Sequence, residues 1–135
     1  MVEICKRDRE VFGADRSQLL TCLWRDGPQY TAMARSASGI AGYIMGRAGA
    51  RAHYIGPWVA NPGSGAAEIL FQEVLGRFDK ETFFVDICAG NPEAAALVKK
   101  AGFRYQRDLT RMFRGPNRYP GNYRCVCGIA GPELG

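Results

Sequence analysis

The sequence predicts an α/β fold: a mixed, mostly antiparallel sheet with a central parallel pair of strands, flanked by helices. Three observations predict it. An amphipathic helical pattern comes early in the chain and is followed by short strands separated by turns. The second half alternates strand, helix, strand and helix, an order that favours a parallel crossover. The second strand of that alternation, residues 82–89, is mostly apolar, which is typical of a strand buried in a parallel sheet.

One domain accounts for the whole chain. A length of 135 residues can bury a substantial core, and no linker, internal repeat or low-complexity tract divides it. We therefore expect a single domain over residues 1–135. Apolar residues make up 47% and charged residues 23%, the composition of a soluble globular protein. The first ten residues are charged and lack the apolar stretch of a secretory signal, so we expect a cytoplasmic protein without a membrane partner.

A net charge of +5 is compatible with a nucleic acid or with an anionic cofactor. The most basic stretch, "RYQRDLTRMFRGPNRY" at residues 104–119, alternates arginines with aromatic residues and resembles a nucleic-acid surface. A pair of strands with one solvated face would give the same pattern, so we expect no nucleic-acid partner. The five cysteines are odd in number, lack C-x-x-C spacing and accompany a single histidine. They predict reduced thiols and no metal site.

The first elements follow from periodicity and turn residues. "ADRSQLLTCLWRDGP" predicts a helix that Asp15 caps, with Gln18 completing a capping-box-like pattern, and that ends at Gly27. Its apolar stripe comprises Leu19, Leu20, Leu23 and Trp24. Residues 30–47 predict two short strands around a Ser-Ala-Ser-Gly turn. Before these elements we expect at most a remnant of a first strand, "VEICK", and hence a domain with a shortened N-terminus. The exposed sheet edge that this leaves predicts a homodimer.

The later elements surround two unusual turns. Residues 52–60 predict a strand that Gly56-Pro57 interrupts, which indicates a bulge or a strand that parts from its neighbour. A helix over 66–78 follows, with apolar residues at i, i+3 and i+4. After strand 82–89, Asn91 caps another helix, which has Pro92 at its first position and stops at Gly102. Residues 103–115 and 122–131 predict two last strands.

The loop "NPGSG" at residues 61–65, between a strand and a helix, predicts an anion site. The first turn of a helix leaves backbone N–H groups unpaired and carries partial positive charge. Small residues let a phosphate approach that backbone. The loop lacks the Gly-Lys-Ser/Thr of a P-loop and is not a dinucleotide-binding fingerprint.

Two motifs resemble the GNAT superfamily of acyl-CoA-dependent N-acyltransferases. "PGSGAA" resembles its pyrophosphate loop, with Gly65 and Ala67 at the two small positions, although Pro62 stands where Arg or Gln is usual. "NPEAAALVKKAGF" resembles a later family motif, although Val98 replaces a tyrosine that is the general acid in many members. "VFGADRSQLL", "GYIMGR", "YIGPW", "RMFRG" and "GPELG" resemble the second domain of certain two-domain GNAT proteins.

The resemblance implies acetyl-CoA, or another acyl-CoA, as cofactor. It also implies direct acyl transfer, within a ternary complex, to a small-molecule or peptide amine. In the family the strand before the loop parts from its parallel neighbour, and the pantetheine arm adds to its free edge. The residues expected to contact the cofactor are Trp58, Val59, Ala60, Gly63, Ser64, Gly65, Ala66, Ala67 and Asn91.

The catalytic candidates are His53, Asp86 and Tyr105. His53 has a suitable intrinsic pKa or is simply exposed. Asp86 lies in an apolar run, which allows three interpretations. It is a general base with a perturbed pKa, it accepts backbone hydrogen bonds, or it pairs with a buried arginine. Tyr105 replaces the missing acid or is a core tyrosine. The alternative function is a degenerate, non-catalytic GNAT-like domain that binds a small molecule or a protein; Pro62 and Val98 favour it.

Overall fold

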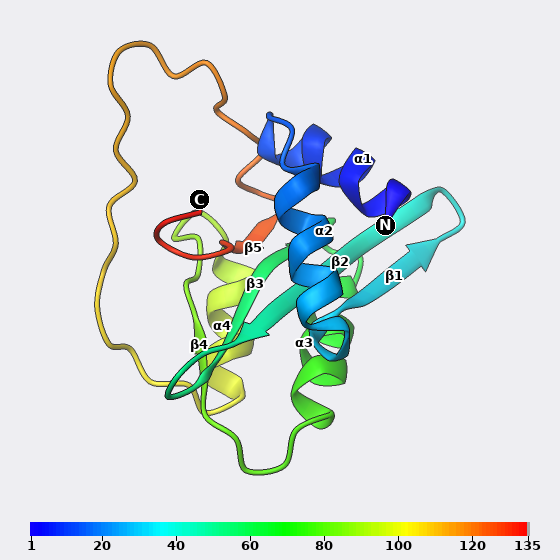
Figure 1. Ribbon diagram of the computed structural model, residues 1–135, viewed down its shortest axis with the longest axis vertical. Helices are drawn as coiled ribbons and strands as arrows, with labels where there is room; N and C mark the ends of the chain where they lie inside the picture. Colours follow the sequence, from blue (N-terminus) through cyan, green and yellow to red (C-terminus); the bar gives the residue numbers. More distant parts are fainter. Residues whose placement is uncertain (135) are drawn as a thin grey trace.

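The computed structural model describes residues 1–134; Gly135, the last residue of the "GPELG" motif, lies outside them. Three layers make up the fold (Figure 1). A five-stranded sheet lies between one pair of helices from the N-terminal part of the chain and another pair from its second half. The elements in chain order are α1 Val2–Phe12, α2 Ser17–Asp26, η1 Pro28–Tyr30, β1 Ala32–Ser36, β2 Gly39–Ala48, β3 His53–Ala60, α3 Ala66–Gly76, β4 Phe83–Val85, α4 Pro92–Lys100 and β5 Val126–Gly128.

The sheet has the predicted mixed topology. Strands β1, β2, β3 and β4 are neighbours in that order, and β5 pairs with β3. The pairs β1–β2, β2–β3 and β3–β5 are antiparallel, whereas β3–β4 is parallel. The fold class and its central parallel pair are therefore confirmed. None of the helices in residues 1–134 is both long and apolar enough to span a membrane.

Two cores cover the two faces of the sheet. On one face α3 and α4 pack over β2 and β3, and the Trp58 and Phe71 rings stack with centroids 4.7 Å apart. On the other face α1 and α2 contribute Ile4, Val11 and Leu20 against β2. Trp24, which the sequence places in the apolar stripe of α2, is 46% exposed.

Helix α1 replaces the expected first strand. The residues "VEICK" lie in α1, so the interpretation of this segment as the remnant of a strand is wrong. Ile4, Asp8 and Val11 are buried at the spacing of one helical face, and this face packs on the sheet. Because the charged Asp8 stands between Ile4 and Val11 on this face, the sequence does not show an apolar helical repeat.

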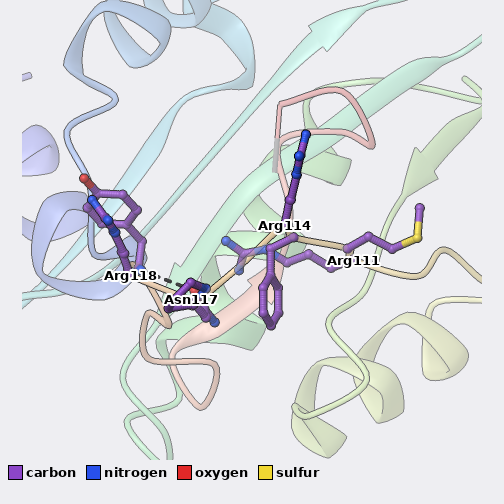
Figure 2. Close-up of a pocket in the computed structure, with 8 residues that line it drawn as sticks. Arg111, Arg114, Asn117 and Arg118 are labelled. Atoms are coloured by element: carbon purple, nitrogen blue, oxygen red, sulfur yellow. Dashed lines mark hydrogen bonds between the residues drawn. The ribbon is translucent and has the colours of Figure 1, made fainter.

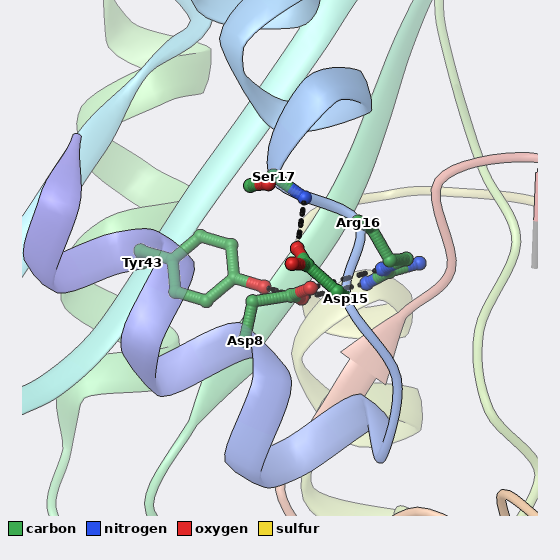
Figure 3. Close-up of polar contacts among 5 residues, drawn as sticks. All are labelled: Asp8, Asp15, Arg16, Ser17 and Tyr43. Atoms are coloured by element: carbon green, nitrogen blue, oxygen red, sulfur yellow. Dashed lines mark hydrogen bonds and ion pairs between the residues drawn. The ribbon is translucent and has the colours of Figure 1, made fainter.

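Asp8 is at the centre of a buried polar cluster (Figure 3). Its carboxylate accepts hydrogen bonds from Arg16 Nη2 at 2.7 Å and Arg16 Nε at 3.0 Å, and from the Tyr43 hydroxyl. Burial, followed by the nearby Asp8 charge, holds the pKa of Tyr43 well above its usual range. The cluster joins α1, the start of α2 and β2. The N-cap of α2 is Arg16 and not Asp15, so the predicted cap is wrong; Asp15 lies one residue earlier and accepts from the Ser17 N–H at 2.9 Å.

The last part of the chain departs from prediction. Residues 103–115 form no strand, and of residues 122–131 only Val126–Gly128 do. Along 103–115 the face that carries Tyr105, Leu109 and Phe113 also carries Arg107 and Arg111, so a strand there could not bury either face. Residues 103–124 instead form an extended connection from α4 to β5 that loops out beside the helices and the sheet (Figure 1).

Candidate functional site

Strands β3 and β4 part where Gly56-Pro57 interrupts β3. Their parallel register runs through three pairs and stops at Ile55 and Val85. Beyond this point β3 pairs with β5, with Trp58 opposite Gly128 and Val59 opposite Val126. The predicted splay therefore exists, and we call the space between the diverging strands the slot. It opens toward the loop 61–65, which follows the end of β3.

The protein's own strand β5 fills the slot. On the β3 side, Ala60 N–H donates to the Cys125 carbonyl at 2.9 Å. On the β4 side, Cys88 N–H donates to Cys127 O at 3.2 Å, and Ile129 N–H donates to Asp86 O at 3.0 Å. Main-chain groups on both edges of the slot are thus paired with the C-terminal segment.

Two side chains hold this segment in place. Asn91 Nδ2 donates to Arg124 O at 3.2 Å and to Val126 O at 3.1 Å, while its Oδ1 caps α4 by accepting from Ala94 N–H at 3.0 Å. The capping role is the predicted one. The buried amide group, however, has its hydrogen bonds within the chain. Arg47 Nη1 donates to Ala130 O at 2.5 Å, and its Nη2 lies 2.7 Å from a Glu133 carboxylate oxygen.

Gly56 lets the C-terminal segment approach β3. Its φ is +148°, and a Cβ placed there would lie 1.8 Å from the Ile129 carbonyl oxygen. No side chain fits at that distance, so the glycine that interrupts β3 is required by the contact with the segment after β5. This contact explains the Gly-Pro break that the sequence shows.

The loop 61–65 has the predicted bounds, because β3 ends at Ala60 and α3 begins at Ala66. Ser64 Oγ donates to Asn61 O at 2.6 Å and accepts from Ala66 N–H at 3.3 Å. Within residues 1–134 no acceptor lies in hydrogen-bond range of the N–H groups of Gly65 and Ala67. These amides lie at the start of α3, where the helix dipole adds positive charge.

One cation and one anion lie beside this loop, and sequence reasoning identified neither. Arg7 of α1 donates to Asn61 Oδ1 through Nη2, and its buried Nε has no partner among residues 1–134. Glu93 of α4 approaches from the other side, with Oε2 3.5 Å from Gly63 N. Arg7 could be found only once residues 2–12 were known to be helical, since no local motif marks it.

The three catalytic candidates do not come together. His53 begins β3, at the far end of that strand from the loop, and its Nδ1 lies 2.5 Å from the Tyr30 hydroxyl. Its Nε2 lies 3.5 Å from a Glu81 carboxylate oxygen. Asp86 follows β4 at the beginning of the slot, and burial raises the pKa of its carboxyl group. Tyr105 is 76% exposed on the extended connection and is not a core residue.

Within residues 1–134 no group of three or more His, Cys, Asp or Glu side chains could hold a metal ion.

Comparison with known proteins identifies one family. A family model described as "Acetyltransferase (GNAT) domain" matches residues 4–126. No match was found among curated proteins or among solved structures.

Proposed function

The chain belongs to the GNAT acetyltransferase family, whose general chemistry is acyl transfer from an acyl-CoA; on this premise we propose that it transfers the acyl group to an amine within a ternary complex. The observation that carries the proposal is the parted strand pair β3–β4, which leads into the loop 61–65. Acetyl-CoA is the proposed cofactor, and the acceptor is a small molecule or peptide with a free amine.

The diphosphate of the cofactor would lie on the loop. The unpaired N–H groups of Gly65 and Ala67 and the dipole of α3 attract an anion there. A Cβ at Gly63 or Gly65 would meet no atom within 4 Å, so the space beside the loop is open. Arg7 supports the proposal because its guanidinium group lies beside the loop, where Pro62 provides no charge, although Glu10 pairs with it at 3.2 Å and would have to share it with the diphosphate. Glu93 opposes an anion and would have to turn away.

The pantetheine arm would add to the β3 edge at Trp58, Val59 and Ala60, next to Asn91. Strand β5 now pairs with this edge, so binding of the arm requires β5 to leave. Only three residues form β5, and a long exposed connection precedes it. Withdrawal of this strand breaks the hydrogen bonds that Ala60, Cys88 and Asn91 make with it, and acyl-CoA would have to replace them. We therefore propose that the structure represents a closed form of the cofactor slot.

The reaction itself needs little from side chains. The amine nitrogen attacks the thioester carbonyl carbon, the C–N bond forms, the C–S bond breaks and the thiolate of coenzyme A leaves. Asp86 is the proposed acceptor of the amine proton, because it lies at the slot and its carboxyl group has a raised pKa. His53 is engaged with Tyr30 and Glu81 at the other end of β3. Water reprotonates the thiolate, since Val98 cannot.

A non-catalytic, binding-only domain is the second candidate, and one observation favours it. Both edges of the slot are already hydrogen-bonded to the C-terminal segment, and Asn91 is satisfied by the same segment. If this closure is permanent, the fold retains the architecture of the family without its cofactor. The outer edge of β1, which has no further strand beside it in residues 1–134, supports the homodimer expected from the sequence.

Titration with acetyl-CoA tests the cofactor proposal. Ligand at 100 times its dissociation constant should stabilise the protein by about 2.7 kcal/mol, measured by thermal shift or calorimetry. We expect Gly65→Asp to weaken binding at least tenfold, because a carboxylate at the helix start repels the diphosphate. Gly65→Asn is the matched control, since it has the same shape without the charge and tolerates the φ of +72°. If the two variants bind acetyl-CoA with equal affinity, the diphosphate does not lie on this loop.

Loosening the C-terminal segment separates the two candidate functions. Arg47→Ala removes the hydrogen bond to Ala130 O and the ion pair with Glu133, so it should raise the population of the open slot. We expect roughly tenfold tighter acetyl-CoA binding, since one hydrogen bond to a charged group contributes about 1.5–3 kcal/mol. Arg77→Ala, which removes bonds to Gln29 O and Thr31 O away from the slot, is the control. Absence of acetyl-CoA binding by Arg47→Ala at millimolar ligand would favour the non-catalytic candidate.

A further inference from the structure

The extended connection between α4 and β5, residues 103–124, contributes no side chain to the proposed acyl transfer and serves there only to link β5 to α4. It forms no helix or strand, and nearly all of its residues are exposed. A pair of strands with one solvated face would explain the alternation of arginines and aromatic residues in this segment without a nucleic-acid partner. Residues 103–124 contain no such pair of strands, so the alternation needs another explanation.

The net charge of the protein is concentrated in this connection. It contains six arginines and one acid, Asp108, and no lysine. The remainder of the chain has twelve basic and twelve acidic residues, so the whole excess of +5 lies in the segment. A second copy of the chain would present the same charge and be repelled at this surface. An anionic partner fits it.

The apolar side chains of the connection are not buried. Tyr105 is 76% exposed, Met112 86%, Phe113 64% and Tyr119 54%. Large aromatic rings in solvent contribute nothing to the core, and they interleave with the arginines along the chain. Their exposure therefore indicates a surface for flat or apolar groups of a partner.

Arginines and aromatic residues line one hollow of about 370 Å³, around which the side chains of Arg114 and Arg118 point in different directions (Figure 2). Arg111, Arg114 and Arg118 line it together with Phe113 and Tyr119, and no acidic residue does. Arg111 Nη1 donates to the Tyr123 hydroxyl at 2.7 Å, which fixes one guanidinium group in place. The hollow thus offers positive charge and ring faces within one surface.

We propose that residues 103–124 bind single-stranded nucleic acid, with the arginines on phosphates and the aromatic rings stacked on bases. Guanidinium groups pair with phosphate oxygens in bidentate geometry and also stack on planar rings. An acidic peptide would use the charge but leave the exposed rings without partners. A membrane surface is best met by an amphipathic helix, and a duplex groove by a rigid helix or ribbon, neither of which is present in this segment. The inference is independent of the acyl-transfer proposal.

The test is fluorescence anisotropy of the full chain with a labelled oligo-uridine and a labelled oligo-thymidine between about 50 and 200 mM salt. Six phosphate contacts predict a slope of log K against log salt of roughly −4 for a single strand. The triple variant Arg111→Ala, Arg114→Ala, Arg118→Ala should reduce that slope by about 2. Its matched control changes the same net charge elsewhere, at Arg9, Arg25 and Arg51, and should leave the slope unchanged.

Aromatic variants give a second readout that general charge attraction would not produce. Phe113→Ala and Tyr119→Ala should each weaken binding by about 5- to 150-fold at an unchanged salt slope, and Phe113→Tyr should restore it. Absence of oligonucleotide binding at about 50 mM salt would overturn the proposal. Equal binding of poly-glutamate or of phosphatidylserine vesicles, with no effect of the aromatic variants, would also overturn it in favour of another anionic partner.

Discussion

Replacing Asp8 by asparagine is expected to lower the free energy of unfolding by about 3–5 kcal/mol, because it removes one partner of a buried ion pair. Asp8 is 1% exposed, and its partner Arg16 has a side chain only 9% exposed. Without the carboxylate, the Arg16 guanidinium loses its bidentate charged partner inside the protein, and the Tyr43 hydroxyl loses a charged acceptor. Urea denaturation followed by circular dichroism measures the change.

Two companion variants show whether the loss comes from the buried pair. Asp15→Asn makes the same substitution seven residues away, but this carboxylate is more than half exposed and pairs with Arg9 at the surface. We expect it to cost at most about 1 kcal/mol. Tyr43→Phe removes one hydrogen bond to the carboxylate and should cost about 1.5–3 kcal/mol. A cost below 1 kcal/mol for Asp8→Asn would show that the cluster does not hold α1 on the sheet.

The cluster also bears on the candidate site, because it holds the helix that carries Arg7. Asp8 follows Arg7 directly in α1, and Arg7 reaches Asn61 in the loop. A protein that loses the Asp8 contacts should therefore lose the cation beside the proposed diphosphate position as well. Loss of stability and loss of acetyl-CoA affinity are expected together in Asp8→Asn. Gly65→Asp should lower the affinity with only the small loss of stability that a side chain at a φ of +72° brings, a loss that Gly65→Asn shares.

Features with a local physical cause could be predicted from the sequence. The loop 61–65 is bounded by small residues and proline, which end one element and permit the start of the next. Asn91 before Pro92 forms a helix cap through its own side chain. In each case the signal and the structure involve the same few residues.

Features that depend on distant partners could not be predicted. In the sequence Asp8 is one of several charged residues near the N-terminus. Its buried role depends on Tyr43, 35 residues later, which donates a hydrogen bond to it. The position of β5 in the slot depends on pairing of Cys125 with Ala60 and of Cys127 with Cys88. Nothing in "CVCG" distinguishes a strand that fills the slot from one that lies at the sheet edge. Strand β5 therefore occupies the edge of β3 that was expected to bind the cofactor, and no local sequence pattern reveals this.

Gly56→Ala is expected to lower the free energy of unfolding by about 2–5 kcal/mol, because two costs combine. The φ of +148° is unfavourable for any residue with a Cβ, and that Cβ would lie 1.8 Å from the Ile129 carbonyl oxygen. The backbone of the C-terminal segment must move away, and the hydrogen bond from Ile129 N–H to Asp86 O is lost with it. Urea denaturation gives the magnitude, and amide exchange at residues 125–129 locates the change.

Gly63→Ala separates the backbone cost from the contact with Ile129. Gly63 also has a positive φ, +70°, but a Cβ there would meet no atom within 4 Å, so we expect a loss of only about 1–2 kcal/mol. The difference between the two variants measures how tightly the C-terminal segment is seated against β3. If Gly56→Ala costs no more than Gly63→Ala, β5 is not held in the slot. If it costs more and also tightens acetyl-CoA binding, the segment and the cofactor compete for the same edge of β3.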